Sequence, residues 1–216
     1  MKRTLLTLLA ATLAIPAFAQ SKFNVGVAAG TLGGSVSASY RVTSGIGLRA
    51  TYNRGSYTRN FTERDVNYDA TVTLDSFGGL IDLYPTGRAF RITGGVLSNR
   101  NRVEGITTDD NFVVINDVRY PSVLVGYLTA QATVNRTSPY AGFGWASSGR
   151  RVGFTFDVGA AYHGAPKLAV QAHPTIPSLV PASFYADLEA ERAKAEQDIS
   201  KYTWHPVVQF GITFGF

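Results

Sequence analysis

The sequence contains no cysteine, which excludes disulfide bonds and thiolate metal sites, and we expect no lipoprotein anchor after a cleaved leader. Beyond the N-terminus, no stretch approaches the ~20 consecutive apolar residues that a membrane-spanning helix requires. The formal net charge of +5 is too small to indicate a nucleic-acid partner. These absences exclude thiol chemistry and argue against a helical membrane protein.

The N-terminus has the three parts of a secretory signal peptide. Lys2 and Arg3 provide a positive start, residues 5–15 form a short apolar run, and Ala17 and Ala19 fit a cleavage site of the A-x-A type. A transmembrane helix is disfavoured because the apolar run is shorter than a span. We therefore predict that residues 1–19 are removed during export and that the mature chain is 20–216.

The C-terminal residues 204–216 alternate strictly between large apolar residues and small or polar ones. One face carries Val208, Phe210, Ile212, Phe214 and Phe216. This is the period of a β-strand. Such an apolar edge promotes aggregation of a soluble domain, but it suits a bilayer if the sheet closes on itself. The segment predicts a strand of a transmembrane β-barrel.

The same alternation recurs along the chain, in the segments 23–30, 35–42, 46–53, 68–83, 90–97, 128–145 and 152–163. In 68–83 the apolar residues change parity after Leu74, and we interpret Gly78 and Gly79 as the site of a β-bulge that produces the shift. Residues 136–139 interrupt the segment 128–145, which is therefore either two strands or one strand bent at Pro139.

Two strands would give nine in total, whereas bacterial single-chain barrels have even numbers. We therefore interpret 128–145 as one strand. The predicted fold class is all-β, an eight-stranded up-and-down antiparallel transmembrane β-barrel with both termini in the periplasm, located in the outer membrane.

Residues 164–203 differ from the rest, because a proline-rich run is followed by an Ala/Glu/Lys/Arg-rich segment. We predict an amphipathic helix at about 182–201 in the last extracellular loop, with Ser183 as its N-cap. Its apolar stripe consists of Phe184, Leu188, Ala195 and Ile199. A lid packed on the barrel mouth is favoured over a partner-binding helix.

Strand parity also predicts which side chains enter the lumen and which anchor the barrel. The polar residues expected inside are Arg41, Arg49, Asp75, Asp82, Arg91, Gln131, Asp157 and Gln209. They could form a polar pathway, but an eight-stranded barrel is narrow enough to be filled by side chains, so a salt-bridged plug is favoured. The aromatics expected at the two membrane interfaces are Tyr40, Tyr52, Tyr68, Tyr84, Trp145 and Trp204.

Candidate chemistry is sparse. His163, His173 and His205, with Ser183, Asp187 and Glu189 nearby, could suggest a metal site or a hydrolase, but the sequence has neither H-E-x-x-H nor G-x-S-x-G. We therefore predict no enzyme, no cofactor and no metal site. The arginines outside the strands could contact lipopolysaccharide phosphates, although solvated loop charge is the favoured interpretation; they are Arg54, Arg59, Arg64, Arg100 and Arg102.

Several segments resemble small outer-membrane β-barrel proteins of Gram-negative bacteria, which are broadly similar to the OmpA transmembrane domain and to OmpW-like barrels. The segments are S-P-Y-A-G-F-G-W-A, F-D-V-G-A-A-Y-H-G-A-P-K-L and K-Y-T-W-H-P-V-V-Q-F-G-I-T-F-G-F. The resemblance implies the fold and the outer-membrane location. It also implies that Phe210, Phe214 and Phe216 form the signal that the barrel-assembly machinery recognises. It implies no catalytic residues.

The sequence thus predicts a non-enzymatic outer-membrane protein with a structural or envelope-interaction role and a lumen plugged by polar side chains. The main alternative is a narrow channel or a lateral-diffusion port for small or apolar solutes, and a third interpretation is a lipid-modifying enzyme. The expected partners are outer-membrane lipid, lipopolysaccharide and, during biogenesis, the assembly machinery. We expect a monomer and no nucleic acid.

Overall fold

The computed structural model describes residues 22–63, 66–86, 89–107, 112–147 and 151–216; the predicted signal peptide lies outside them. The strands are β1 (Phe23–Gly30), β2 (Gly33–Arg41), β3 (Ile46–Glu63), β4 (Val66–Leu83), β5 (Phe90–Asn99), β6 (Arg102–Thr107), β7 (Phe112–Ile115), β8 (Val118–Pro121), β9 (Tyr127–Thr133), β10 (Thr137–Ala146), β11 (Val152–Tyr162), β12 (Lys167–His173) and β13 (Trp204–Gly215). The helices are α1 (Ser122–Val125), the 3-10 helix η1 (Pro177–Leu179) and α2 (Ala182–Ile199). Among the described residues, none of these helices combines the length and apolar character needed to cross a membrane.

Eight strands form a closed antiparallel barrel, which confirms the predicted fold class. Around the barrel the order is β1, β2, β3, β4, β5, β10, β11 and β13, and β13 returns to pair with β1. The closing pair runs from Asn24 opposite Gly215 to Gly30 opposite Gln209. Each barrel strand therefore has two neighbours, as a sheet in a bilayer requires.

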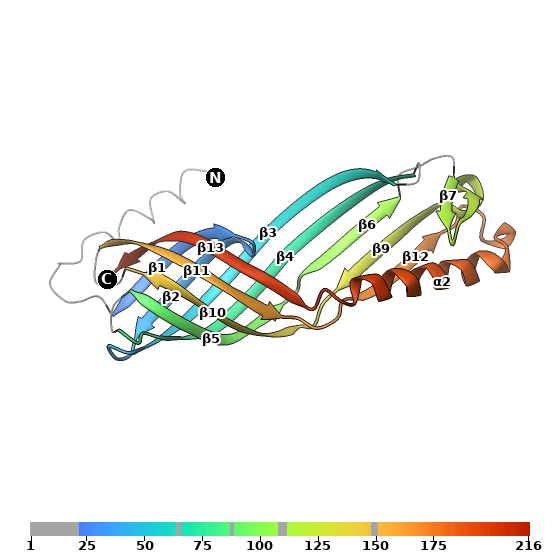
Figure 1. The fold of residues 1–216 in the computed structure, drawn as a ribbon. Helices are drawn as coiled ribbons and strands as arrows, with labels where there is room; N and C mark the ends of the chain where they lie inside the picture. Colours follow the sequence, from blue (N-terminus) through green and yellow to red (C-terminus); the bar gives the residue numbers. More distant parts are fainter. Residues whose placement is uncertain (1–21, 64–65, 87–88, 108–111, 148–150) are drawn as a thin grey trace, which may run out of the picture.

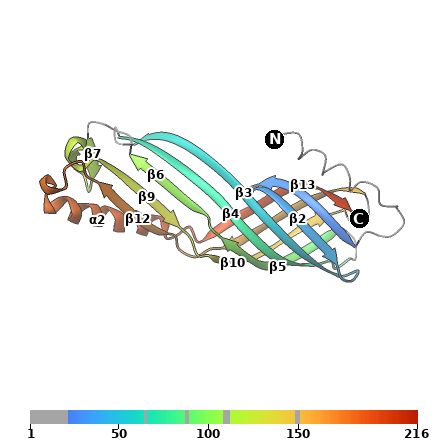
Figure 2. The same ribbon diagram turned by 180° about the vertical axis from the view of Figure 1, so that it is seen from behind.

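An open sheet continues from one end of the barrel (Figures 1 and 2). β3 and β4 have 18 residues each, and their outer halves extend past the barrel. There β4 pairs with β6, β6 with β9, and β9 with β12. We call this part, residues 55–63 and 66–74 with β6, β9 and β12, the sheet extension. The last residues of β13 lie at the opposite end of the molecule (Figure 1).

The predicted β-bulge in β4 is wrong. The pairing of β3 with β4 is unbroken from Ile46 opposite Leu83 to Glu63 opposite Val66. The apolar residues change parity because β4 leaves the barrel and continues into the sheet extension, where the opposite face of the strand is apolar. In the barrel, Phe77 faces outward, whereas the apolar residues of the sheet extension, such as Val72, lie on the opposite face of the same strand.

The segment 128–145 is not the single bent strand that the sequence predicts: it forms β9 and β10, and β10, in which Pro139 is paired with Val96, belongs to the barrel. β10 pairs with β5 in the barrel, and β9 pairs with β6 in the sheet extension. The register continues across the interruption, since Thr137 is opposite Ser98 and Thr133 is opposite Arg102. β9 and β10 therefore follow one continuous path along the sheet. The barrel itself has eight strands.

The helix α2 falls within the predicted range, but its start and its position differ from the prediction. The N-cap is Pro181 and not Ser183, and no side chain caps this end. Phe184 is fully buried with Val113 and Tyr120 of the β7–β8 hairpin. The helix then runs alongside β12 in both views (Figures 1 and 2).

Two side chains of α2 bind the free edge of β12. The backbone N–H of Leu168 donates to Glu196 Oε2 at 3.1 Å, and Arg192 Nη1 donates to the carbonyl of Leu168 at 3.3 Å. An open strand edge invites pairing with another chain. The helix therefore protects the edge of the sheet extension. The prediction that it forms a lid on the barrel mouth is wrong.

Candidate functional site: the barrel interior

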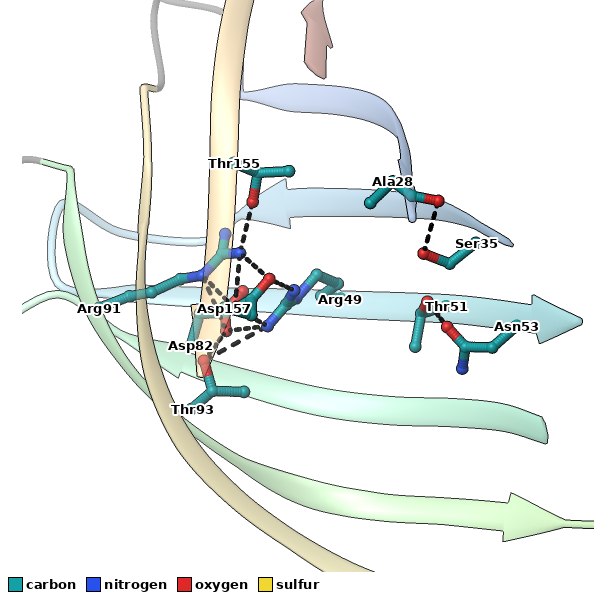
Figure 3. Close-up of polar contacts among 10 residues, drawn as sticks. All are labelled: Ala28, Ser35, Arg49, Thr51, Asn53, Asp82, Arg91, Thr93, Thr155 and Asp157. Carbon is teal, nitrogen blue, oxygen red and sulfur yellow. Dashed lines mark hydrogen bonds and ion pairs between the residues drawn. The ribbon is translucent and has the colours of Figure 1, made fainter. Parts of the chain in front are cut away.

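Four charged side chains meet inside the barrel (Figure 3). Arg49 of β3 binds Asp157 of β11 (Nη1 to Oδ2, 3.0 Å) and Asp82 of β4 (Nη2 to Oδ1, 3.0 Å). Arg91 of β5 binds Asp157 with an Nη2 to Oδ2 distance of 2.8 Å. β3 and β11 are separated by three strands in either direction around the barrel. The pair of Arg49 and Asp157 therefore spans the full width of the lumen.

Threonine hydroxyls complete this network. Thr93 Oγ1 donates to Asp82 Oδ1 at 2.6 Å, and Arg91 Nη2 donates to Thr155 Oγ1 at 2.8 Å. Asp82 is 1% exposed and Arg91 3%. Buried charges are tolerated only when they are paired and hydrogen-bonded. Two cations and two anions balance here, so the cluster carries no net charge.

An apolar layer fills another part of the lumen. It consists of Leu32, Leu80, Leu97, Tyr140, Ala161 and Val207, all of them buried. Glycines make room for the tyrosine: a Cβ at Gly142 would lie 2.6 Å from the Tyr140 hydroxyl, and one at Gly159 would lie 2.7 Å from it. The small residues in the barrel wall therefore allow a large side chain to cross the interior.

The space left between the charged and apolar layers is small. The cavity there has a volume of about 60 Å³ and touches Arg49, Asp157, Tyr140 and Val207. A volume of this size holds a few water molecules at most.

Two other residues that were predicted to lie in the lumen, Arg41 and Gln209, also point inward. Arg41 lies on the inward face of β2, with its guanidinium 3.6 Å from the ring of Tyr84, and donates to the carbonyl of Ser44 at 3.1 Å. Gln209 is buried, is opposite Asp157 in the register and lines the small cavity. Both point inward but lie outside the four-charge network.

Asp75 and Gln131 do not lie in the lumen, and these two predictions are wrong. Because the β3–β4 register has no bulge, Asp75 shares the outward face of Phe77. Gln131 belongs to β9 in the sheet extension, where it is exposed and donates to Glu104 Oε1 at 3.0 Å. Parity alone placed them inside, because it does not show where the strands leave the barrel.

Most of the predicted interface aromatics project outward. Tyr40, Tyr52, Trp145 and Trp204 are exposed on the barrel surface, as are Phe210, Phe214 and Phe216. Tyr84 is a wrong prediction, since it is buried under Arg41 on the inward face. The Tyr68 side chain lies outside the described side chains.

The three histidines do not converge on one site. His163 Nδ1 contacts the carbonyl of Gly164 at 2.9 Å, His205 Nε2 contacts the carbonyl of Thr31 at 3.1 Å, and His173 Nε2 contacts Thr129 Oγ1 at 3.1 Å. In the described ranges, no group of three or more metal-ligating side chains could hold a metal ion.

The acidic residues near Ser183 have structural partners. Asp187 accepts hydrogen bonds from Tyr120 and Asn116, and Glu189 pairs with Arg192 at 2.7 Å. Tyr120 and Asn116 belong to the β7–β8 hairpin and its turn. Asp187 therefore attaches α2 to this hairpin.

Two parts of the interior were missed from the sequence. The hydroxyls of Thr93 and Thr155 give no signal beyond their parity. The apolar layer does leave a signal in the sequence. Leu80, Leu97 and Val207 are large apolar residues at inward positions, and they weaken the alternation of apolar and polar residues locally. Such interruptions could have indicated an apolar filling of the lumen.

No family model matches the chain, and no curated protein matches its sequence. Two crystal structures from Acinetobacter baumannii are similar in fold. CarO2 has 20% sequence identity and a TM-score of 0.60, covering 90% of this chain and 98% of that chain. CarO has 21% identity and a TM-score of 0.59, covering 92% of this chain and 100% of that chain. At this identity the likeness is one of fold, and it extends over nearly the whole of the three proteins.

Proposed function

We propose that the chain is an integral outer-membrane β-barrel protein without enzymatic activity, with a closed lumen and a structural or envelope-interaction role. The location is supported by the barrel surface, where large apolar side chains are exposed; examples are Leu48, Phe77, Ile81, Phe143, Phe154, Phe210 and Ile212. A surface of this kind is unfavourable in water and suits the hydrocarbon of a bilayer. The CarO-like fold supports the same location.

The observation that carries the closed lumen is the ion pair that crosses the barrel from Arg49 to Asp157. Together with Asp82, Arg91 and the apolar layer, it surrounds a cavity of about 60 Å³ in the described part of the barrel interior. A permeating ion would have to break paired, buried charges, which is costly in a low-dielectric interior. A barrel filled in this way acts through its surfaces and not through a pore.

The proposed orientation places the sheet extension and α2 outside the cell. It is supported by the short connections at the end of the barrel where β13 ends and by the long excursions at the other end, the arrangement of outer-membrane barrels. Recognition of Phe210, Phe214 and Phe216 by the assembly machinery, a monomeric state and a closer relation to OmpA or OmpW-like barrels remain part of this proposal.

Cysteine labelling tests the location and orientation. Because the chain has no cysteine, Ala190→Cys on α2 introduces a single thiol. An impermeant thiol reagent is expected to label it on intact cells, with the protein in the outer-membrane fraction. A cysteine in the turn at Ser44 is the matched control and is expected to react only after the outer membrane is opened. The reverse pattern would place α2 in the periplasm and contradict the proposal.

A lateral-diffusion port for apolar solutes is the second candidate. It is favoured by the inner face of the sheet extension, where Val72, Val103, Ala132 and Val170 lie on the same side as the apolar layer of the barrel. This function requires the wild-type barrel to carry an apolar solute into liposomes. A closed barrel with a surface role gives no uptake above that of protein-free liposomes.

A further inference from the structure

We propose that the outer face of the sheet extension binds the phosphorylated oligosaccharide head group of a glycolipid in the surrounding outer leaflet. This site deepens the proposed envelope role and rests on the proposed location. In β3 and β4, Tyr52 and Phe77 are register partners on the outward barrel surface, and the next pair on the same face is Arg54 with Asp75.

Two residues of a strand span about 7 Å. The outward face therefore changes from apolar to charged within one residue pair and continues without a break into the sheet extension. A lipid that lies with its acyl chains against Tyr52 and Phe77 has its head group beside this face. The sheet extension thus stands where the head groups of adjacent lipids must be.

Basic side chains occupy the part of the face nearest the barrel. Arg54 and Arg100 lie on either side of Asp75, and the backbone N–H of Arg100 donates to the Asp75 carbonyl at 2.8 Å. The next row along the sheet carries Arg102 and Lys167, both register partners of Thr133.

These basic residues are exposed, and Arg100 and Lys167 form no ion pair with any residue in the described part of the chain. The sequence favoured solvated loop charge for Arg54, Arg100 and Arg102, but the register gathers them on one sheet face. Arginine and lysine side chains on this part of the face, next to the barrel, donate charge-assisted hydrogen bonds to phosphate.

Farther from the barrel the same face is hollowed. The hollow has a volume of about 600 Å³ and is lined by hydroxyl, amide and carboxylate groups that include Thr58, Thr71, Glu104, Thr129, Gln131 and Gln171. Thr58 and Thr71 are hydrogen-bonded at 3.0 Å, and Glu104 accepts from Gln131 and pairs with Arg102 at 3.1 Å. These contacts hold the donors and acceptors in place before a ligand arrives.

An aromatic pair follows at the end of the hollow. Tyr127 and His173 are register partners on β9 and β12, stacked with their ring centroids 4.5 Å apart and their planes at 14°. His173 also contacts Thr129, which lines the hollow. Aromatic rings with one apolar face and a polar edge suit contact with a sugar ring.

The order of these features selects the ligand. Going outward from the barrel, the face presents apolar, basic, then hydroxyl- and amide-rich surface, and finally an aromatic pair. A phosphorylated glycolipid presents its groups in the same order, with acyl chains in the bilayer, phosphates at its surface and sugars beyond. A soluble phosphate would use only the basic rows, and a neutral polysaccharide only the hollow.

Binding to purified mature protein in detergent micelles tests the site independently of its cellular location. The probe is lipopolysaccharide with a phosphorylated inner core and no outer polysaccharide. Arg102→Ala/Lys167→Ala and, separately, Thr129→Val/Gln131→Met are each expected to weaken its binding by about tenfold or more. The control Arg119→Ala/Lys194→Ala removes two positive charges elsewhere on the extracellular part and is expected to bind as the wild type does. Unchanged mobility on unheated gels shows that each barrel is folded.

Two further probes separate the parts of the ligand. With dephosphorylated lipopolysaccharide, the Arg102/Lys167 variant is expected to match the wild type, whereas the Thr129/Gln131 variant still binds more weakly. Wild-type affinity in both variants for the phosphorylated probe would overturn the site, even if fractionation places the protein in the outer membrane. Equal affinity for the acyl-free core oligosaccharide would overturn the assignment to a membrane glycolipid.

Discussion

Arg49 and Asp157 are joined by a 3.0 Å ion pair between strands on opposite sides of the barrel. Asp157 also accepts from Arg91, so one carboxylate connects β11 to both β3 and β5. The pair therefore links the barrel wall across its width as well as occupying the lumen. The same side chains therefore bear on the stability of the barrel and on the proposed closure of its lumen.

Asp157→Asn is expected to destabilise the barrel strongly. The substitution leaves Arg49 and Arg91 with one carboxylate, Asp82, in a buried environment, and breaking such a cluster costs on the order of 3–5 kcal/mol. Urea unfolding of the refolded barrel in micelles measures the change. Asp198→Asn on the exposed side of α2 is the matched control and is expected to leave the midpoint unchanged. Equal midpoints for both variants would show that the network contributes little to stability.

Gly142→Ala is expected to destabilise the barrel by about 1–3 kcal/mol, the usual cost of overpacking. The added Cβ would lie 2.5 Å from the carbonyl oxygen of Val158 and 2.6 Å from the Tyr140 hydroxyl. Gly79→Ala is the control, because nothing lies within 4 Å of a Cβ at that position. The refolding yield and the unfolding midpoint are measured for both. A loss of stability in Gly79→Ala and not in Gly142→Ala would contradict the packing described for Tyr140.

Arg192→Ala/Glu196→Ala is expected to promote self-association. These side chains bind both backbone groups of Leu168 on the edge of β12, and their removal exposes that edge for pairing with another chain. Sedimentation velocity in detergent measures the oligomeric state. The control Asp198→Ala/Lys201→Ala changes two charges at the end of the helix and is expected to stay monomeric. A monomeric Arg192/Glu196 variant would mean that α2 is not what protects the edge.

The attachment of α2 to the β7–β8 hairpin is expected to weaken in acid. The hydrogen bond from Tyr120, and then that from Asn116, lowers the pKa of Asp187 below its ordinary range. A carboxyl group whose pKa is lower in the folded state contributes stability above its unfolded pKa, ~3.9, and loses it as the pH falls through the folded pKa.

Hydrogen exchange in α2 measures this effect. Exchange is expected to be slower in the wild type than in Asp187→Asn at neutral pH, and the difference is expected to vanish below the folded pKa. A difference that persists in strong acid would show that the carboxylate charge is not responsible.

The sequence alone was sufficient for the barrel and insufficient for the sheet extension. The alternation in residues 204–216 predicted β13, and inward parity selected Arg49, Arg91 and Asp157, which the structure brings together. The same rule failed for Asp75 and Gln131. A period of two assigns a residue to a face, but it does not tell whether that face meets lipid, lumen or water at that height.

Tyr84 and α2 show the second limit of the sequence. An aromatic residue near a strand end suits a membrane interface, yet Tyr84 has the inward parity of Leu80 and Asp82, and its ring lies 3.6 Å from the Arg41 guanidinium. The helical stripe of α2 predicted a buried face but not its partner, since the edge of β12 and the β7–β8 hairpin come together only in the folded chain. Long-range pairing of this kind has no local signal.

Conductance across a planar bilayer tests the closed lumen most directly. The refolded mature wild type is compared with Arg49→Ala/Asp157→Ala and with Asp198→Ala/Lys201→Ala, a control that removes two exposed, opposite charges outside the barrel. We expect the wild type and the control to be silent and the Arg49/Asp157 variant to leak. Discrete openings of the wild-type protein would contradict the closed lumen and would favour a channel.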